Sequence, residues 1–183
     1  MKTQYYTASS LDGFIATEDH SLDWLMQLGD PEETRYPEFF AEVGALVMGA
    51  RTYEWMLKHA IFPEAGEPAP WPYAQPCWVM TSNRLPEIPG ADIRFASGDI
   101  RKVHAEMAAA ANGKNIWVVG GGELAGSFHD AGLLDEIIVQ VCPVTLGKGQ
   151  PLFPRRIAIP PMKLTDVRRY GVFVELRYDI DKS

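Results

Sequence analysis

The sequence predicts an α/β fold whose sheet is mostly parallel and has an antiparallel end. Up to about residue 131, short β-prone apolar segments alternate with segments whose apolar residues recur at helical spacing. The later segments 136–141 and 172–178 are β-prone, and no helical pattern accompanies them. Alternating strands and helices are typical of a parallel sheet, whereas terminal strands without helices favour antiparallel pairing.

In the first half of the chain, apolar periodicity and turn residues locate the elements. In chain order we predict a strand at 4–9, a turn between β-prone segments at 11–16, helices at 21–28 and 37–42, a buried strand at 45–49 and a helix at 51–56. The stretch 62–76 contains prolines throughout, which forbid a regular helix. We therefore predict a surface loop there, and its Trp71 and Tyr73 are candidates to cover a pocket.

The second half continues the alternation until its last two strands. We predict a strand at 77–82, an amphipathic helix at 100–111, a strand that begins at 116, a helix that ends near 131, and strands at 136–141 and 172–178. The helix at 100–111 carries apolar residues at helical spacing, and the pair Asn112-Gly113 ends it.

Composition and charge exclude several classes of protein. The 183 residues fit a single domain, 1–183, and the net charge of −7 disfavours nucleic acid and anionic membranes as partners. No apolar run approaches the ~20 residues of a membrane span. Residues 1–6 lack a signal-peptide core, so we expect a cytoplasmic protein. Cys77 and Cys142 lack CxxC spacing, which predicts buried free thiols and no metal site.

The segment from Ile116 to Phe128 is the most informative in the chain. An apolar β-type run enters three consecutive glycines, 120–122, and a helical pattern follows. Backbone N–H groups at such a helix N-terminus bind phosphate, and glycine lets the backbone approach it closely. The segment is neither a P-loop nor the spaced GxGxxG pattern, so a tight structural turn is the alternative.

Two other predicted strands end in a similar way. Gly49, Arg51 and Thr52 follow one strand, and the run 81–84 (TSNR) follows another. Because open α/β sheets bind ligands at the carboxyl ends of their strands, the three ends together predict an extended, multiply phosphorylated ligand. Arg51 suits bidentate pairing with a phosphate, and the hydroxyls at 81–82 suit a ribose or its 2′-phosphate. The alternative is that the arginines are solvated surface charges and that 81–83 is an ordinary turn.

Four ordered motifs resemble one known family over nearly the whole chain. They are 8–16 (ASSLDGFIA), 47–53 (VMGARTY), 118–122 (VVGGG) and 143–153 (PVTLGKGQPLF). The sequence is similar to the dihydrofolate reductase-like family, in the branch that includes the C-terminal reductase domain of the riboflavin-biosynthesis deaminase-reductase. The resemblance implies a three-layer fold with helices on both faces of the sheet, and it makes a homodimer the expected assembly.

The resemblance also implies NADPH lying across the strand ends. By position, it places Ala8 and Ile15 at the nicotinamide, Gly49, Arg51 and Thr52 near the adenosine-side phosphates, Thr81, Ser82, Asn83 and Arg84 at the adenine ribose, and Gly120, Gly121, Gly122, Glu123, Leu124 and Ala125 at the pyrophosphate. A hydride acceptor would stack on the nicotinamide, because the cofactor supplies the chemistry and the protein orients the reactants.

On the substrate side the resemblance is thinner. Dihydrofolate reductases carry an acid on their first helix, and here Asp23 is the candidate proton donor. Its neighbour Trp24 is a candidate residue of the substrate pocket. The alternative for Asp23 is a carboxylate that only stabilises the helix N-terminus. Gln140 lies in an apolar strand and is expected either in the substrate cleft or on an exposed face. Phe153 either borders the substrate or only packs.

These observations support two classes of function. The first is an NADPH-dependent reductase of a small heterocyclic substrate, pterin- or aminopyrimidine-like; within it, 5-amino-6-(5-phosphoribosylamino)uracil reduction is an alternative. The second is a nucleotide-binding module without catalysis. The sequence does not distinguish NADPH from NADH.

Overall fold

The computed structural model describes residues 1–29, 31–63 and 67–182. Its strands are β1 (Thr3–Ser10), β2 (Phe14–Ala16), β3 (Val43–Gly49), β4 (Cys77–Met80), β5 (Ile93–Ala96), β6 (Asn115–Gly120), β7 (Glu136–Cys142), β8 (Gln150–Pro151), β9 (Lys163–Tyr170) and β10 (Phe173–Asp179). Its helices are α1 (Asp23–Met26), α2 (Tyr36–Ala41), α3 (Ala50–Met56), α4 (Ile100–Ala110) and α5 (Gly122–Asp130), with single turns η1 (Pro31–Glu33) and η2 (Leu57–Ile61).

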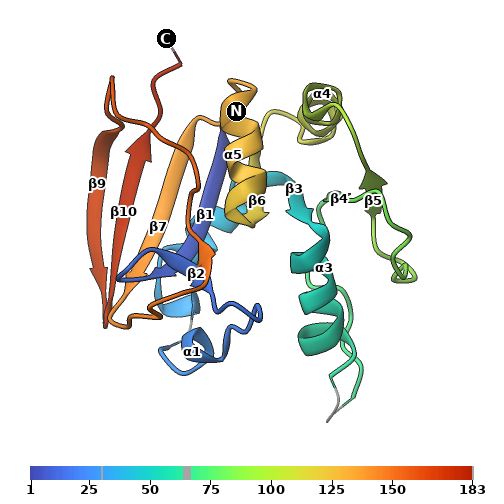
Figure 1. The fold of residues 1–183 in the computed structure, drawn as a ribbon. Coiled ribbons are helices and arrows are strands. Elements are labelled where there is room, and N and C mark those ends of the chain that lie inside the picture. Colours follow the sequence, from blue (N-terminus) through green and yellow to red (C-terminus); the bar gives the residue numbers. More distant parts are fainter. Residues whose placement is uncertain (30, 64–66, 183) are drawn as a thin grey trace.

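Within these residues, the main sheet has eight strands in the order β5-β4-β3-β6-β1-β7-β10-β9 (Figure 1). All neighbours from β5 to β7 pair in parallel, and β10 runs antiparallel to both β7 and β9. The small strands β2 and β8 pair separately. The predicted mostly parallel sheet with an antiparallel C-terminal strand is confirmed.

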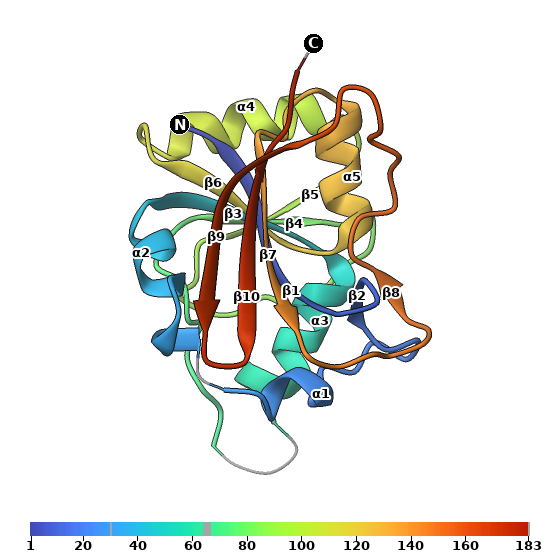
Figure 2. The same cartoon turned by 90° about the vertical axis from the view of Figure 1, so that its left-hand side faces the viewer.

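Apolar side chains fill the space between the sheet and the helices on both of its faces. On one face, α4 and α5 cover a core that includes Tyr5 and Phe128. On the other face, α2 and α3 cover a core that includes Phe39, Leu46 and Tyr53. Figure 2 shows α2 and α5 on opposite sides of the sheet. The three-layer arrangement expected from the resemblance is thereby confirmed.

β1 is the strand along which the two halves of the sheet separate. It pairs with β7 from Gln4 to Ser10, but with β6 only from Thr3 to Tyr5. β6 ends at Gly120, where the chain turns into α5. The carboxyl half of β1 therefore has one side paired with β7, while its other side faces the ends of β6 and β3.

The structure differs from the sequence-based elements in several places, and the short strand β8 and the turns η1 and η2 are among the elements that were not predicted. The helix predicted at 21–28 shortens to the single turn of α1, and β5 and β9 were not predicted. β9 is an edge strand whose residues are largely exposed, so its sequence KLTDVRRY lacks the apolar alternation of a half-buried strand. In the predicted loop 62–76, of which 64–66 lie outside the described residues, Trp71 and Tyr73 pack in the core beside Tyr53.

Both cysteines are buried and unpaired, as predicted. Burial raises the pKa of the Cys77 thiol to about 12 and that of Cys142 to about 11. None of the helices in the described parts of the chain has the length and apolar character needed to cross a bilayer.

The first residue of α5 must be glycine because the helix starts against the chain at β8. A Cβ on Gly122 would meet the Pro151 carbonyl oxygen and would lie 2.6 Å from that of Leu152. We expect Gly122→Ala to lower the free energy of unfolding by about 1–3 kcal/mol, the usual cost of overpacking. Urea unfolding measures the loss. Gly49→Ala is the control, because its Cβ would find its nearest atom at 4.0 Å; equal stability of the two variants would contradict the argument.

Candidate functional site

A cavity of about 500 Å³ lies where the carboxyl ends of β1, β3, β4 and β6 meet the starts of α3 and α5. We call it the first cavity. Its walls come from segments far apart in the sequence. They are Thr7, Ala8, Ile15, Ala16, His20, Leu22, Leu25, Gly49, Ala50, Arg51, Thr52, Trp55, Met80, Val119, Gly120, Gly121, Gly122, Glu123, Leu124, Gln150, Pro151 and Pro154.

The glycine turn presents the N-terminus of α5 to this cavity. Gly121 is the N-cap residue and no side chain caps the helix; the first intrahelical hydrogen bond runs from the N–H of Ala125 to the Gly121 carbonyl. The backbone N–H groups of the first turn therefore have no intrahelical partner. A Cβ at Gly121 would be in ordinary van der Waals contact with Ile15 Cδ1, 3.7 Å away, and Gly121 itself lines the cavity. This end of α5 can accept an anion.

Arg51 and Thr52 enter the first cavity from the start of α3. Arg51 is exposed, and among the described residues no ion pair or hydrogen bond engages its guanidinium. The Thr52 hydroxyl lies near the glycine turn, 3.2 Å from where a Gly120 Cβ would stand. The wall of the first cavity thus contains a cation and a hydroxyl in addition to the α5 N-terminus.

Asp12 joins the turn after β1 to the loop before β8. Its carboxylate accepts hydrogen bonds from the Ser10 hydroxyl at 2.6 Å and from the N–H groups of Leu146 at 3.1 Å and Gly147 at 2.7 Å. These donors, the Ser10 hydroxyl foremost, hold the pKa of Asp12 below its usual range. Asp12 therefore positions the loop whose continuation, at Gln150, lines the first cavity.

A second cavity, of about 340 Å³, adjoins the first. The two share Thr7, Ala8 and Leu25, so they meet at the carboxyl half of β1. Aromatic and aliphatic side chains form most of the second cavity. Its walls are Tyr6, Thr7, Ala8, Leu25, Met26, Gly29, Glu32, Tyr36, Trp117, Gln140 and Phe173.

The polar side chains Tyr6 and Gln140 form the inner end of the second cavity, and Glu175, which does not line it, lies behind them. The Gln140 amide nitrogen donates to the Tyr6 hydroxyl at 2.6 Å and to the Glu175 carboxylate at 3.2 Å. The Tyr6 hydroxyl donates to the same carboxylate oxygen at 2.9 Å. Glu175 is only 3% exposed. Burial, with the Glu175 charge, raises the pKa of Tyr6, so its phenol stays protonated.

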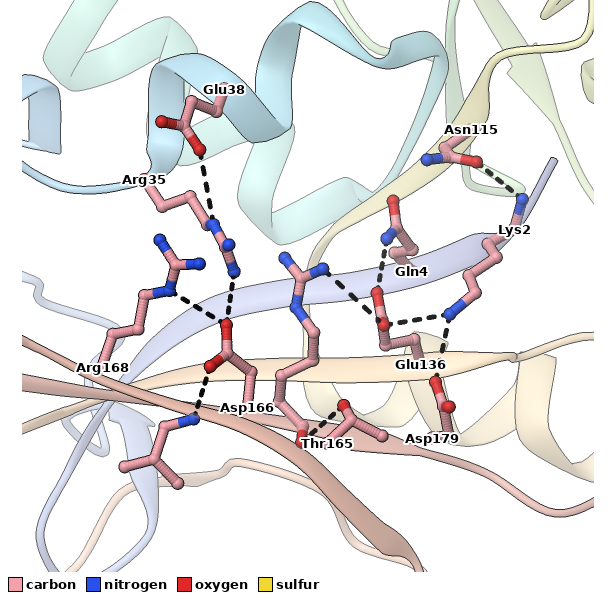
Figure 3. Close-up of polar contacts among 12 residues, drawn as sticks. Lys2, Gln4, Arg35, Glu38, Asn115, Glu136, Thr165, Asp166, Arg168 and Asp179 are labelled. Atoms are coloured by element: carbon pink, nitrogen blue, oxygen red, sulfur yellow. Dashed lines mark hydrogen bonds and ion pairs between the residues drawn. The ribbon is translucent and has the colours of Figure 1, made fainter.

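Charged side chains next to this cluster are paired with one another (Figure 3). Arg35, at the start of α2, donates to Asp166 at 2.8 Å and lies 3.5 Å from Glu38. Arg168, on β9, also pairs with Asp166, at 3.0 Å. Both arginines are therefore engaged by carboxylates.

The structure brings together most of the predicted cofactor residues. Those that line the first cavity are Ala8, Ile15, Gly49, Arg51, Thr52, Gly120, Gly121, Gly122, Glu123 and Leu124. Five others are outside its lining: Ala125 is buried in the core, and Thr81, Ser82, Asn83 and Arg84 follow Met80 at the strand end.

The predicted substrate residues divide in the same way. Gln140 lines the second cavity. Asp23 is exposed as the first residue of α1, and neither it nor Trp24 lines either cavity. Phe153 packs against the core and the His129 ring, with the ring centroids 5.8 Å apart. For Asp23 and Phe153 the geometry favours the alternatives, a carboxylate at a helix start and a packing side chain.

Sequence analysis missed the aromatic walls and Glu175. Tyr6, Trp117 and Phe173 each lie in a predicted strand. An apolar side chain in a strand is normally expected in the core, so the sequence does not indicate that these three line a cavity. Glu175 interrupts an apolar strand, as Gln140 does in its neighbour, and β7 and β10 pair these two residues directly. An isolated polar residue in each of two apolar strands was the signal available.

Comparison with known proteins identifies the family of this chain. The model of the RibD C-terminal domain matches residues 71–175, more than half of the chain. The uncharacterized protein YwjB of Bacillus subtilis is 32% identical over 178 residues, covering 97% of each chain. A crystal structure from Shewanella sp. PV-4, of a protein assigned by its name to riboflavin biosynthesis, has 26% identity and a TM-score of 0.78, covering 98% of each chain.

A more distant structure shows the same fold inside a longer chain. It is the Thermotoga maritima protein named diaminohydroxyphosphoribosylaminopyrimidine deaminase/5-amino-6-(5-phosphoribosylamino)uracil reductase, with 18% identity and a TM-score of 0.63. The match covers 97% of the present chain and 56% of the Thermotoga chain. Together, the family-model match and the relative that matches at full length show that this chain belongs to the RibD C-terminal domain family.

Proposed function

We propose that the protein is an NADPH-dependent reductase that transfers a hydride to a small heterocyclic substrate. The observation that carries the proposal is the junction of two cavities along Thr7 and Ala8. One cavity offers anion-binding groups and the other an aromatic slot with a polar end. A reductase needs two such sites with a common wall, because the nicotinamide and the ring that it reduces must be in contact.

The residues of the first cavity fit a dinucleotide phosphate. The N-terminus of α5 and Arg51, which is unpaired within the described parts of the chain, provide two anion-binding groups, and Thr52 provides a hydroxyl. Bound there, NADPH would supply the hydride. Ala8 and Ile15 would hold the nicotinamide end at the junction, and the residues at 120–124 would hold the pyrophosphate. The ribose contacts expected of 81–84 remain a prediction.

Family membership supports a reductase, and the Thermotoga name suggests one substrate. Reduction of 5-amino-6-(5-phosphoribosylamino)uracil is therefore an alternative activity for this chain. A binding module without catalysis is the second alternative, because Asp23, the candidate proton donor, lies outside both cavities. Turnover of NADPH with any ring substrate would exclude the second alternative.

We expect the purified protein to bind NADPH, as measured by nicotinamide fluorescence and tryptophan quenching, with an affinity that falls as salt rises. Arg51→Ala should weaken binding roughly tenfold or more, the worth of a charge-assisted hydrogen bond. Arg101→Ala on the exposed side of α4 is the matched control and should bind as the unmodified protein does. Absence of NADPH and NADH binding, or an Arg51→Ala variant of full affinity, would contradict the proposed phosphate site.

Asp23 can be tested once a substrate is found. Because its carboxylate is exposed at the start of α1 and lines neither cavity, we expect Asp23→Asn to retain most of the turnover. The pH profile of kcat is the measurement. A loss of roughly a hundredfold or more, the range of general acid catalysis, would instead make Asp23 the proton donor.

We also propose that two copies of the chain associate through the outer face of β9 and β10. Leu164, Val167 and Val174 are exposed, and the strand register places all three on the face opposite Glu175. Light scattering should give the mass of a dimer, and Val167→Lys should shift it towards the monomer. A monomeric mass at micromolar concentration would be the contrary result.

A further inference from the structure

The polar end of the second cavity has its hydrogen-bond donors already engaged. Glu175 is a carboxylate and accepts only, so the amide end of Gln140 that faces it must be the nitrogen. That nitrogen donates to Glu175 and to the Tyr6 hydroxyl, which are hydrogen-bonded to each other on the same side of it, so the nitrogen is turned towards this pair and the carbonyl oxygen is turned away. The single proton of Tyr6 also points to Glu175.

What remains for a ligand is an acceptor. The Gln140 carbonyl oxygen has no hydrogen-bond partner among the described residues. It is also not fully buried, so a ligand can reach it. Gln140 itself lines the cavity. A ligand that reaches this end therefore meets an oxygen with a carboxylate behind it, which suits an N–H group and repels an anion.

The charged residues around the second cavity also disfavour an anionic ligand. None of the described residues that line it is Lys, Arg or His, whereas Glu32 does line it. The nearby Arg35 and Arg168 are engaged by Asp166, as Figure 3 shows. Arg51, for which the described residues provide no ion-pair partner, lines the first cavity and not the second.

From this arrangement we infer that the second cavity takes a flat, uncharged ring with an N–H edge and rejects rings that carry phosphate or carboxylate. The aromatic walls, with Trp117 and Tyr36, suit a planar ring. Glu175 acts as a positioning residue: it turns the Gln140 amide so that the oxygen faces the ligand. The inference rests on the proposed function, and it assigns a substrate class different from the phosphorylated pyrimidine in the Thermotoga protein's name.

Three small pteridines test the inference by calorimetric titration of the full chain with saturating NADP⁺. The neutral 6-hydroxymethylpterin has N–H donors, pterin-6-carboxylate adds a negative charge at the same position, and 1,3-dimethyllumazine lacks N–H donors. We expect the first to bind at least about tenfold more tightly than either of the others, because unpaired polar groups and like charges are costly in a closed site. Equal affinities, tighter binding of the carboxylate, or binding of none of the three would overturn the inference.

Two variants connect the selectivity to the residues. Gln140→Met keeps the size of the side chain and removes the acceptor, so affinity for 6-hydroxymethylpterin should fall roughly tenfold. Gln4→Met is the matched control, because Gln4 is also a buried amide beside a buried carboxylate, Glu136, but lines neither cavity. In Glu175→Gln the new amide can pair with either end of the Gln140 amide, so the orientation of Gln140 is no longer fixed. The preference for the neutral pterin over pterin-6-carboxylate should then shrink to about threefold or less.

The outcomes separate this inference from the proposed function. If NADPH binds and no pteridine does, the substrate class is wrong and the cofactor site stands. If neither NADPH nor NADH binds but the neutral pterin is preferred, the reductase proposal fails and the second cavity keeps its assigned ligand class. Circular dichroism and NADPH affinity show whether each variant is folded. A Glu175→Gln protein that is folded and discriminates as before would overturn the positioning role of Glu175.

Discussion

β1 pairs with β7 almost to its end but leaves β6 after Tyr5, because β6 ends in the glycine turn that begins α5. The backbone of Thr7 and Ala8 is thereby held rigidly from one side and is open to a ligand on the other. Both cavities share these two residues. The groups that could bind a cofactor and those that could bind a ring therefore lie on either side of the same short piece of β1.

The site divides charge between its two halves. The first cavity has the exposed Arg51 and the uncapped N-terminus of α5, both favourable to anions. The second has Glu32 and, behind its inner end, Glu175. Such a division allows one protein to hold a phosphate-rich molecule and an uncharged ring side by side, because each cavity disfavours the other's ligand.

Glu175 is expensive to bury, and no cation pairs with it among the described residues. Tyr6 and Gln140 compensate it with two hydrogen bonds from neutral donors. In return, the carboxylate removes the rotational freedom of the Gln140 amide.

The sequence by itself determined the α/β class, the antiparallel C-terminal strand and the glycine turn, because apolar periodicity and runs of glycine act through neighbours in the chain. It also placed Arg51 and Thr52 at a strand end. It could not show β9, whose edge position removes the apolar pattern, nor could it show that α1 leaves Asp23 exposed. Only the tertiary structure decided that Tyr6, Gln140 and Glu175 meet, since strand pairing across 169 residues of sequence separation brings them together.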